Sequence, residues 1–177
     1  MKNVLASLAQ IGRLKELARS GWLLEGISQP ESVAAHSFRT ALFALALGPE
    51  LGVNAEKLLK MVLVHDLGES DPRVGDITPF DGISPDEKHR MESDAMQDLC
   101  SSLPNGGEML ELWRDYEAEE SPEARMAKQL DIFEMALQAL EYEKKYGITL
   151  PRFREQARNR LDHPLLRELY YICSQSV

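Results

Sequence analysis

Helical periodicity runs through almost the whole chain and constrains its fold more than any other feature. Apolar residues recur every three to four positions, and stretches of alternating, β-branched residues that would indicate strands are few. The pattern therefore predicts an all-α fold. With 177 residues, 44% of them hydrophobic, the chain is expected to form a single domain, residues 1–177, with a core that needs no disulfide.

Residues typical of helix ends mark where the expected helices begin and stop. Asn54 is an expected N-cap, Ser84 opens a capping box with proline at the first helical position, and Gly147 is an expected helix stop. The expected helices cover 1–18, 32–47, 55–69, 85–103, 108–119, 122–146, 151–161 and 164–175. The first is amphipathic and is interpreted as a helix of the fold, not as a signal peptide. The long irregular stretch 70–83 is rich in Pro, Gly and Asp, and such loops are often functional.

Polar residues interrupt three of these helices where the pattern favours apolar ones. They are His36, the pair His65 and Asp66, and Asp131. Buried carboxylates without a partner are costly, and neighbouring like charges raise one another's pKa, so a positive group should lie between them. Two imidazoles and two carboxylates suit one divalent ion, either Mn, Fe, Co, Zn or Mg. Glu69 lies one helical turn beyond the pair, so it is expected close to the ion without necessarily binding it.

Each of these residues has a simpler interpretation when it is taken alone. A buried histidine such as His36 is more often a hydrogen-bonded core residue, and Asp131 could pair with Lys128 or a helix terminus. The coincidence of several anomalies on three helices favours the metal. His89 is interpreted as a surface residue, His163 as part of a helix start and Trp113 as core.

Several linked motifs resemble those of a known enzyme family. The order His36, His65-Asp66, Asp131 resembles the H…HD…D signature of the HD-domain phosphohydrolases, which are all-helical bundles with a metal site in the core. Around it stand RSGW (19–22), PESVAAHSFR (30–39), LVHDLGE (63–69), GDITPFD (75–81), EKHR (87–90) and KQLDIFEMALQALEYE (128–143). Together they are similar to the 5′-deoxynucleotidase branch, which includes the HD-domain-containing protein 2 and YfbR-like proteins. The resemblance is strongest over 19–147, and 148–177 would add C-terminal helices.

The resemblance implies a metal-dependent 5′-deoxynucleotidase that acts as a homodimer on a small-molecule nucleotide. It would cleave deoxyribonucleoside 5′-monophosphates to deoxynucleoside and phosphate with one divalent metal ion. By position, the resemblance implies that the metal ligands are His36, His65, Asp66 and Asp131. The catalytic residues would be Glu69 and Asp76. Phosphate and sugar would be held by Arg19 and Trp22.

The loop after Glu69 departs from the family spacing. It is longer by about two residues than the resemblance leads us to expect. Asp71 could therefore share the role of Asp76, and Arg73 could add a phosphate contact. Lys128 is a further candidate for substrate binding. The spacing of RSGW also differs from the adjacent Arg-Trp pair of bacterial relatives, which makes Arg19 less secure than Trp22.

The chemistry expected of these residues is the hydrolysis of a phosphate ester by positioning and charge stabilisation. Arg19 would neutralise phosphate charge with its planar guanidinium. Glu69 would accept a proton from the attacking water, and Asp76 would orient that water or donate to the leaving 5′-oxygen. Trp22 could form an apolar wall that excludes a 2′-hydroxyl.

Composition narrows the choice of partners and compartment. The formal charge is −9 and the basic residues are dispersed, which argues against a nucleic acid polymer or an anionic membrane as partner. No run approaches the roughly 18 apolar residues of a membrane span. Cys100 and Cys173 show no CxxC spacing, which fits a reducing cytoplasm.

Other functions remain open at this level. A hydrolase of nucleoside triphosphates or alarmones would use the same ligands, although it would need more basic residues. A catalytically silent metal or nucleotide sensor would not need Glu69 and Asp76. A helical interaction module would bind no metal at all.

Overall fold

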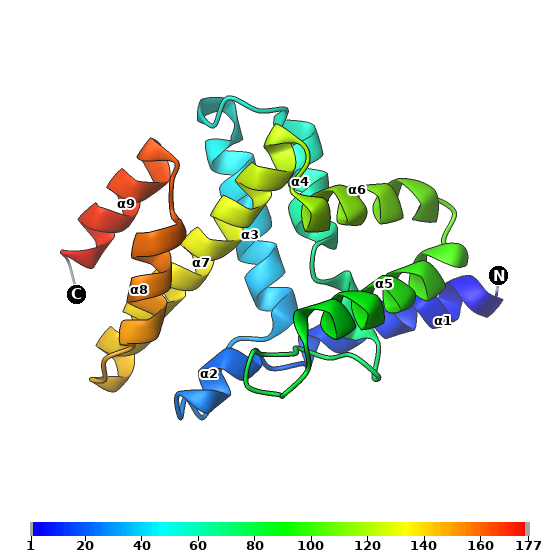
Figure 1. Cartoon of the computed structure of the whole chain (residues 1–177), viewed down its shortest axis with the longest axis horizontal. Coiled ribbons are helices and arrows are strands. Elements are labelled where there is room, and N and C mark those ends of the chain that lie inside the picture. The colour runs from blue at the N-terminus through cyan, green and yellow to red at the C-terminus, as the bar shows by residue number, and fades with distance from the viewer. Residues whose placement is uncertain (1, 176–177) are drawn as a thin grey trace.

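The computed structural model describes residues 2–175, and helices dominate it (Figure 1). They are α1 (Lys2–Ile11), α2 (Ser20–Leu24), α3 (Val33–Leu47), α4 (Ala55–Val64), α5 (Pro85–Ser101), α6 (Gly106–Ala118), α7 (Pro122–Tyr146), α8 (Pro151–Arg160) and α9 (Pro164–Ser174). Short 3-10 helices cover Gly12–Lys15 (η1), Gly48–Glu50 (η2) and Leu67–Ser70 (η3). The described residues contain no β-strand, only an isolated antiparallel bridge between Ala18 and Ser32. The all-α prediction is confirmed.

Side-chain caps are present at the starts of α3, α4, α5 and α7. The side chains of Ser32, Asn54, Ser84 and Ser121 each accept a hydrogen bond from a backbone N–H three residues further on. At the other end of α7, Gly147 adopts a φ of 65°, which glycine reaches without strain. These bonds satisfy polar groups that a helix end leaves unpaired, and they explain why the boundaries were readable from the sequence.

The helix predicted over 55–69 is wrong in its last five residues. α4 ends at Val64, and just after it the ring Nδ1 of His65 binds the carbonyl of Val62 at 2.8 Å. Asp66 then leaves the helical conformation with φ −102° and ψ 10°, and Glu69 falls in η3. The first helix is also shorter than expected, since α1 stops at Ile11. The break at His65 changes the directions in which the functional residues point.

Helix α7 is the centre of the packing. It contacts α3, α4, α6, α8 and α9, and its buried residues belong to the larger of two hydrophobic clusters. Figure 1 shows α8 and α9 on one side of α7 and the α5 and α1 helices on the other. A second cluster joins η1, α5 and α6. The predicted metal ligands lie where α3, α4 and α7 meet.

Among the helices of residues 2–175, none is long and apolar enough to cross a membrane.

Candidate active site

Three helices bring the predicted metal ligands together. The two imidazole Nε2 atoms of His36 and His65 lie 3.4 Å apart. The Nε2 of His36 is 3.1 Å from Asp131 Oδ1, and that of His65 is 3.1 Å from Asp66 Oδ2. The structure therefore brings His36, His65 and Asp131 together as a compact group, and Asp66 lies at its edge, 3.1 Å from His65 and 3.8 Å from His36.

The hydrogen bonds of the two imidazoles suit them to a metal ion. A carbonyl can only accept, so Nδ1 of His65 carries the hydrogen that binds Val62, and its Nε2 faces the carboxylates. In the same way, Nδ1 of His36 donates to Glu134 Oε2 at 2.5 Å. This is the arrangement that fixes the tautomer and direction of metal-binding histidines. Ligand atoms of His36, His65 and Asp131 all lie within 4.8 Å of one another. The donor set fits a divalent cation.

The charges around this point stabilise one another. Burial and Arg19 lower the pKa of His36, but Glu134 and Asp131 outweigh them and raise it to about 10. Burial raises the pKa of Asp131, yet His36 and His65 outweigh burial and hold that pKa below its usual range. The pKa of Asp66 is also held below its usual range: burial raises it, but His65, His36 and Arg19 together outweigh burial. The carboxylates thus remain ionised although they are buried.

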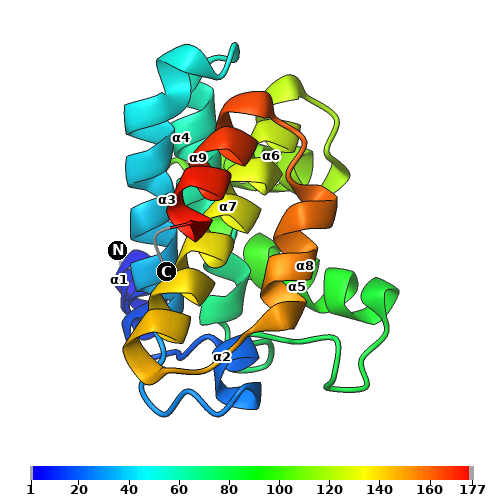
Figure 2. The same ribbon diagram turned by 90° about the vertical axis from the view of Figure 1, so that its left-hand side faces the viewer.

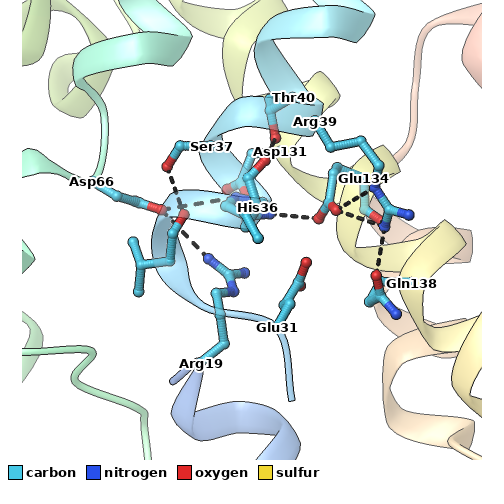
Figure 3. A network of polar contacts seen from close by, with 12 residues as sticks. Arg19, Glu31, His36, Ser37, Arg39, Thr40, Asp66, Asp131, Glu134 and Gln138 are labelled. Atoms are coloured by element: carbon cyan, nitrogen blue, oxygen red, sulfur yellow. Dashed lines mark hydrogen bonds and ion pairs between the residues drawn. The ribbon is translucent and has the colours of Figure 1, made fainter. Parts of the chain in front are cut away.

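A second layer of polar side chains holds His36 in place (Figure 3). Glu134, which is fully buried, binds His36 through one oxygen and accepts a bond of 2.7 Å from Arg39 Nε through the other. Arg39 also binds Glu141 at 2.8 Å and Gln138 at 2.9 Å. Sequence analysis missed this layer. Its signal was the spacing: Glu134 follows Asp131 by three residues and Arg39 follows His36 by three, so each shares a helix face with a ligand.

Glu69 and Asp76 both line the cavity beside the ligands. Glu69 is buried, and its Oε2 has no hydrogen-bond partner within residues 2–175. Burial raises the pKa of Glu69 well above its usual range, and the charges of Asp66 and Asp76 raise it further. Asp76 is held by the backbone N–H of Ser20, which donates to its Oδ2. A buried carboxylate oxygen without a partner indicates a group that binds something else.

Arg19 and Trp22 reach the same cavity from the start of the chain. Arg19 donates to Asp66 at 3.4 Å. Burial lowers the pKa of Arg19, but the carboxylates of Asp66 and Asp131 outweigh it, so the pKa is raised and the charge is secure. Trp22 is only 1% exposed, its Nε1 donates to Glu31 at 3.0 Å, and its ring stacks on Phe153 with centroids 4.2 Å apart. Trp22 is therefore a packed core residue with one edge at the cavity.

The structure does not bring Arg73 to the cavity, which corrects the expected phosphate contact. Its backbone N–H and its guanidinium both bind Asp71, and Nη2 also binds Asp98 at 2.8 Å. This short local turn points the side chain outward, where it is 63% exposed. Asp71 is likewise absent from the cavity lining. Of the two loop aspartates, Asp76 alone faces the predicted ligands.

The cavity has a volume of about 590 Å³ and a wall that sequence analysis described only in part. Lys128 lines it as predicted, with Nζ 3.1 Å from Glu117 and 3.7 Å from the centroid of the Tyr116 ring. Tyr116 donates to Asp131 at 3.2 Å. His89 is exposed, as expected, and it also stacks on Trp113 and lines the cavity. Further lining residues that were missed are Phe80, Lys88, Glu92, Arg152, Phe153 and Gln156.

Comparison with known proteins agrees with this geometry. The HD domain family matches residues 11–169. A zebrafish (Danio rerio) protein named 5′-deoxynucleotidase HDDC2 is 44% identical over 149 residues, which cover 83% of this chain and 73% of that protein. Human 5′-deoxynucleotidase HDDC2 is 38% identical over 173 residues, covering 95% of this chain and 83% of that one.

A solved structure shares the fold over nearly the whole length. It is described as a predicted metal-dependent phosphohydrolase from Magnetospirillum magnetotacticum. The TM-score is 0.73 at 27% identity, and the match covers 99% of this chain and 91% of that one.

Proposed function

This chain belongs to the HD domain family, and from that premise we propose that it is a metal-dependent 5′-deoxynucleotidase. It hydrolyses a phosphomonoester, the bond between phosphate and the 5′-oxygen of a deoxyribonucleoside. This proposal depends chiefly on one observation: the Nε2 atoms of His36 and His65 lie close to the carboxylates of Asp131 and Asp66. Beside them is Oε2 of Glu69, which is buried and has no hydrogen-bond partner among the described residues. We take residues 1–177 as one HD domain.

The proposed metal ligands are His36, His65, Asp66 and Asp131. A divalent cation at such a site supplies Lewis-acid polarisation of a phosphate oxygen and a lowered pKa for a bound water. The mixed nitrogen and oxygen donors suit Mn²⁺, Co²⁺, Fe²⁺, Zn²⁺ or Mg²⁺, and the absence of thiolate ligands favours the harder ions of this group.

The remaining residues have separable roles in the reaction. Arg19, which is cationic and directed at the site by Asp66, balances charge on the phosphate oxygens. Glu69 takes a proton from the attacking water while the water oxygen bonds to phosphorus. Asp76, held by Ser20, orients this water or returns a proton to the 5′-oxygen as the P–O bond breaks. The edge of Trp22 forms an apolar wall against which a 2′-hydroxyl would have no hydrogen-bond partner.

The charge of the cavity favours a monophosphate over a polyphosphate. Four lysine and arginine residues line it, and three of them are paired away from the proposed ligands: Lys128 with Glu117, Arg152 with Glu25, and Lys88 with the carbonyl of Ile77, whereas Arg19 pairs with Asp66 itself. Arg19 is left nearest the ligands. A triphosphate would bring more negative charge than this arrangement neutralises.

Phosphate release from a panel of nucleotides tests the function. Protein stripped with a chelator and reloaded with Mn²⁺, Co²⁺ or Mg²⁺ is expected to release phosphate from deoxyribonucleoside 5′-monophosphates. Release should be slower from ribonucleoside monophosphates and slower still from triphosphates and alarmones. Faster hydrolysis of a triphosphate would move the chain to another branch of the family, and release with none of the metals would leave a sensor or an interaction module.

We also propose that the chain forms a homodimer through α3. Phe38, Leu42 and Leu45 recur at helical spacing on α3 and are exposed although they are large and apolar. Figure 2 shows α3 along one edge of the molecule, where the described residues place no helix outside it. An exposed apolar surface of this kind marks protein contacts.

Charge placed on this surface should separate the protomers. The double variant Phe38→Glu, Leu45→Glu is expected to elute as a monomer where the unchanged protein elutes as a dimer, because two buried carboxylates per protomer would oppose association. Light scattering after size exclusion measures the mass. The control Leu24→Glu alters an equally apolar exposed residue on α2 and should leave the dimer intact. An unchanged mass in the double variant would place the interface elsewhere.

The compartment that we propose is the cytoplasm. Both cysteines, Cys100 and Cys173, are free in the structure, which suits a reducing environment. A small-molecule nucleotide is available there as substrate.

A further inference from the structure

The cavity is larger than a phosphate site needs, and its two ends differ in chemistry. At one end, toward α5 and α6, charged side chains pair with one another: Lys128 with Glu117, His89 with Glu117, and Lys88 with Glu92. At the other end, between α2, α8 and the loop after η3, three of the lining side chains are aromatic. This second end contains Trp22, Phe80, Arg152, Phe153 and Gln156. A flat, uncharged ring system fits the aromatic end better, because it can stack on the rings and on the guanidinium of Arg152 without breaking the ion pair between Arg152 and Glu25.

Phe80 is held at the rim of this end although it is 64% exposed. The turn that presents it is tightly bonded. Thr78 donates to Asp81 Oδ2 from its backbone N–H at 2.6 Å and from its hydroxyl at 2.8 Å, and the N–H of Phe80 donates to the Thr78 hydroxyl at 3.2 Å. Lys88 ties the loop to α5 by donating to the carbonyl of Ile77 at 3.1 Å. An exposed aromatic ring fixed in this way is preorganised to be covered by a ligand.

Arg152 extends the aromatic surface. Its guanidinium carbon lies 4.8 Å from the ring centroid of Phe80 and 5.0 Å from that of Phe153. Glu25 holds the same guanidinium at 3.0 Å. Planar guanidinium groups and aromatic rings are the surfaces on which nucleobases stack. Figure 2 shows the loop passing beside the start of α8, so segments distant in the sequence form this surface together.

We propose that Phe80, Arg152, Phe153 and Gln156 form the nucleobase subsite of this enzyme. The inference rests on the proposed function, because it assumes that a nucleoside 5′-monophosphate places its phosphate near Arg19 and the metal ligands. The base then lies at the aromatic end, beyond the edge of Trp22. Contact is mainly through ring faces, which every base has, so the subsite accepts both purines and pyrimidines. Gln156 supplies an amide that can donate or accept, so it excludes neither.

The subsite is tested by comparing substrates with and without a base. For Phe80→Ala, the KM for deoxyribonucleoside 5′-monophosphates should rise about tenfold relative to the KM for 2-deoxyribose 5-phosphate, in line with the loss of one stacking contact. The increase should be similar for adenine and thymine nucleotides. The control is Tyr171→Ala, which removes an equally exposed ring (65%) on α9, outside the cavity, and should leave the ratio of the two KM values unchanged.

A binding measurement separates this inference from the proposed function. Calorimetric titration with deoxyadenosine, which has no phosphate, reads the subsite without turnover. We expect deoxyadenosine to bind the unchanged protein and to bind Phe80→Ala about tenfold more weakly. This result would support the subsite even if no phosphate is released from any nucleotide. Equal effects of Phe80→Ala on substrates with and without a base, or no effect on either, would overturn it. If the protein binds deoxyadenosine but hydrolyses no nucleotide, the proposed function is wrong and the subsite still stands.

Discussion

The variant Glu69→Gln is expected to lose turnover while it keeps the metal. The amide is nearly isosteric but cannot take a proton from water, and loss of a general base typically lowers the rate by about 10²- to 10⁴-fold. Glu69 lies in η3, beyond the break at His65, so its carboxylate is beside the ligand group and its Oε2 has no partner within the described chain. Steady-state kinetics measures kcat, and metal analysis after dialysis measures the bound ion.

The control for this prediction is Glu92→Gln. Glu92 lines the same cavity and is largely buried, but it pairs with Lys88 at 3.5 Å and is not assigned to the reaction. Its kcat should stay within about threefold of the unchanged protein, as for a change remote from the reacting atoms. If Glu69→Gln retained normal turnover, Glu69 would have no place in the mechanism. If it lost the metal as well, Glu69 would have to be counted among the ligands.

The variant Glu134→Ala is expected to weaken metal binding although Glu134 is not itself a proposed ligand. Without it, Nδ1 of His36 loses its acceptor, and the imidazole is no longer fixed with Nε2 toward Asp131. Outer partners of this kind typically contribute a factor of about 10 to 100 in metal affinity. Titration of chelator-stripped protein with Mn²⁺ or Co²⁺ measures the Kd. The rise in melting temperature on adding metal, which should be smaller in the variant, gives a second readout.

The structure offers a matched control for this experiment. Glu141 binds the same Arg39 at 2.8 Å but makes no contact with His36, so Glu141→Ala removes a partner of the arginine alone. Its metal affinity should stay near that of the unchanged protein. Glu134→Gln, whose side-chain oxygen can still accept from His36, should recover part of the affinity. If Glu134→Ala and Glu141→Ala had equal effects, the role of Glu134 would be general stability and not the orientation of His36.

The sequence was informative wherever a local rule applied. Ser84 and Ser121 cap their helices as expected, and Gly147 ends α7, since a cap depends only on a few neighbouring residues. The proposed ligand residues could be recognised in the sequence because each is a polar or charged residue within an otherwise apolar helical segment. The resemblance to the HD family added the roles of Glu69 and Asp76, which no periodicity could supply.

Sequence reasoning failed where a long-range contact decides the outcome. The helix expected over 55–69 ends five residues early, at Val64. The ring of His65 just after it has its Nε2 3.4 Å from that of His36, which lies 29 residues away in the sequence. Arg73 turned away because Asp71 and Asp98 hold it, and Asp98 lies 25 residues further on. Glu134 was overlooked because its partner, His36, is 98 residues distant. Of these residues, only Glu134 had a signal in the sequence, its spacing of three residues from Asp131.

The sequence by itself determined most of the helices, the caps at Asn54 and Ser84, the stop at Gly147, and the kinds of atoms available for a metal and a phosphate. Those properties follow from interactions within a turn or two of the backbone, which the order of residues specifies directly. The tertiary structure alone decided which loop aspartate faces the ligands, which glutamate supports His36 and which aromatic rings line the cavity. These depend on the packing of α3, α7 and α8 against one another, and packing brings together residues whose separation along the chain says nothing about their distance in space.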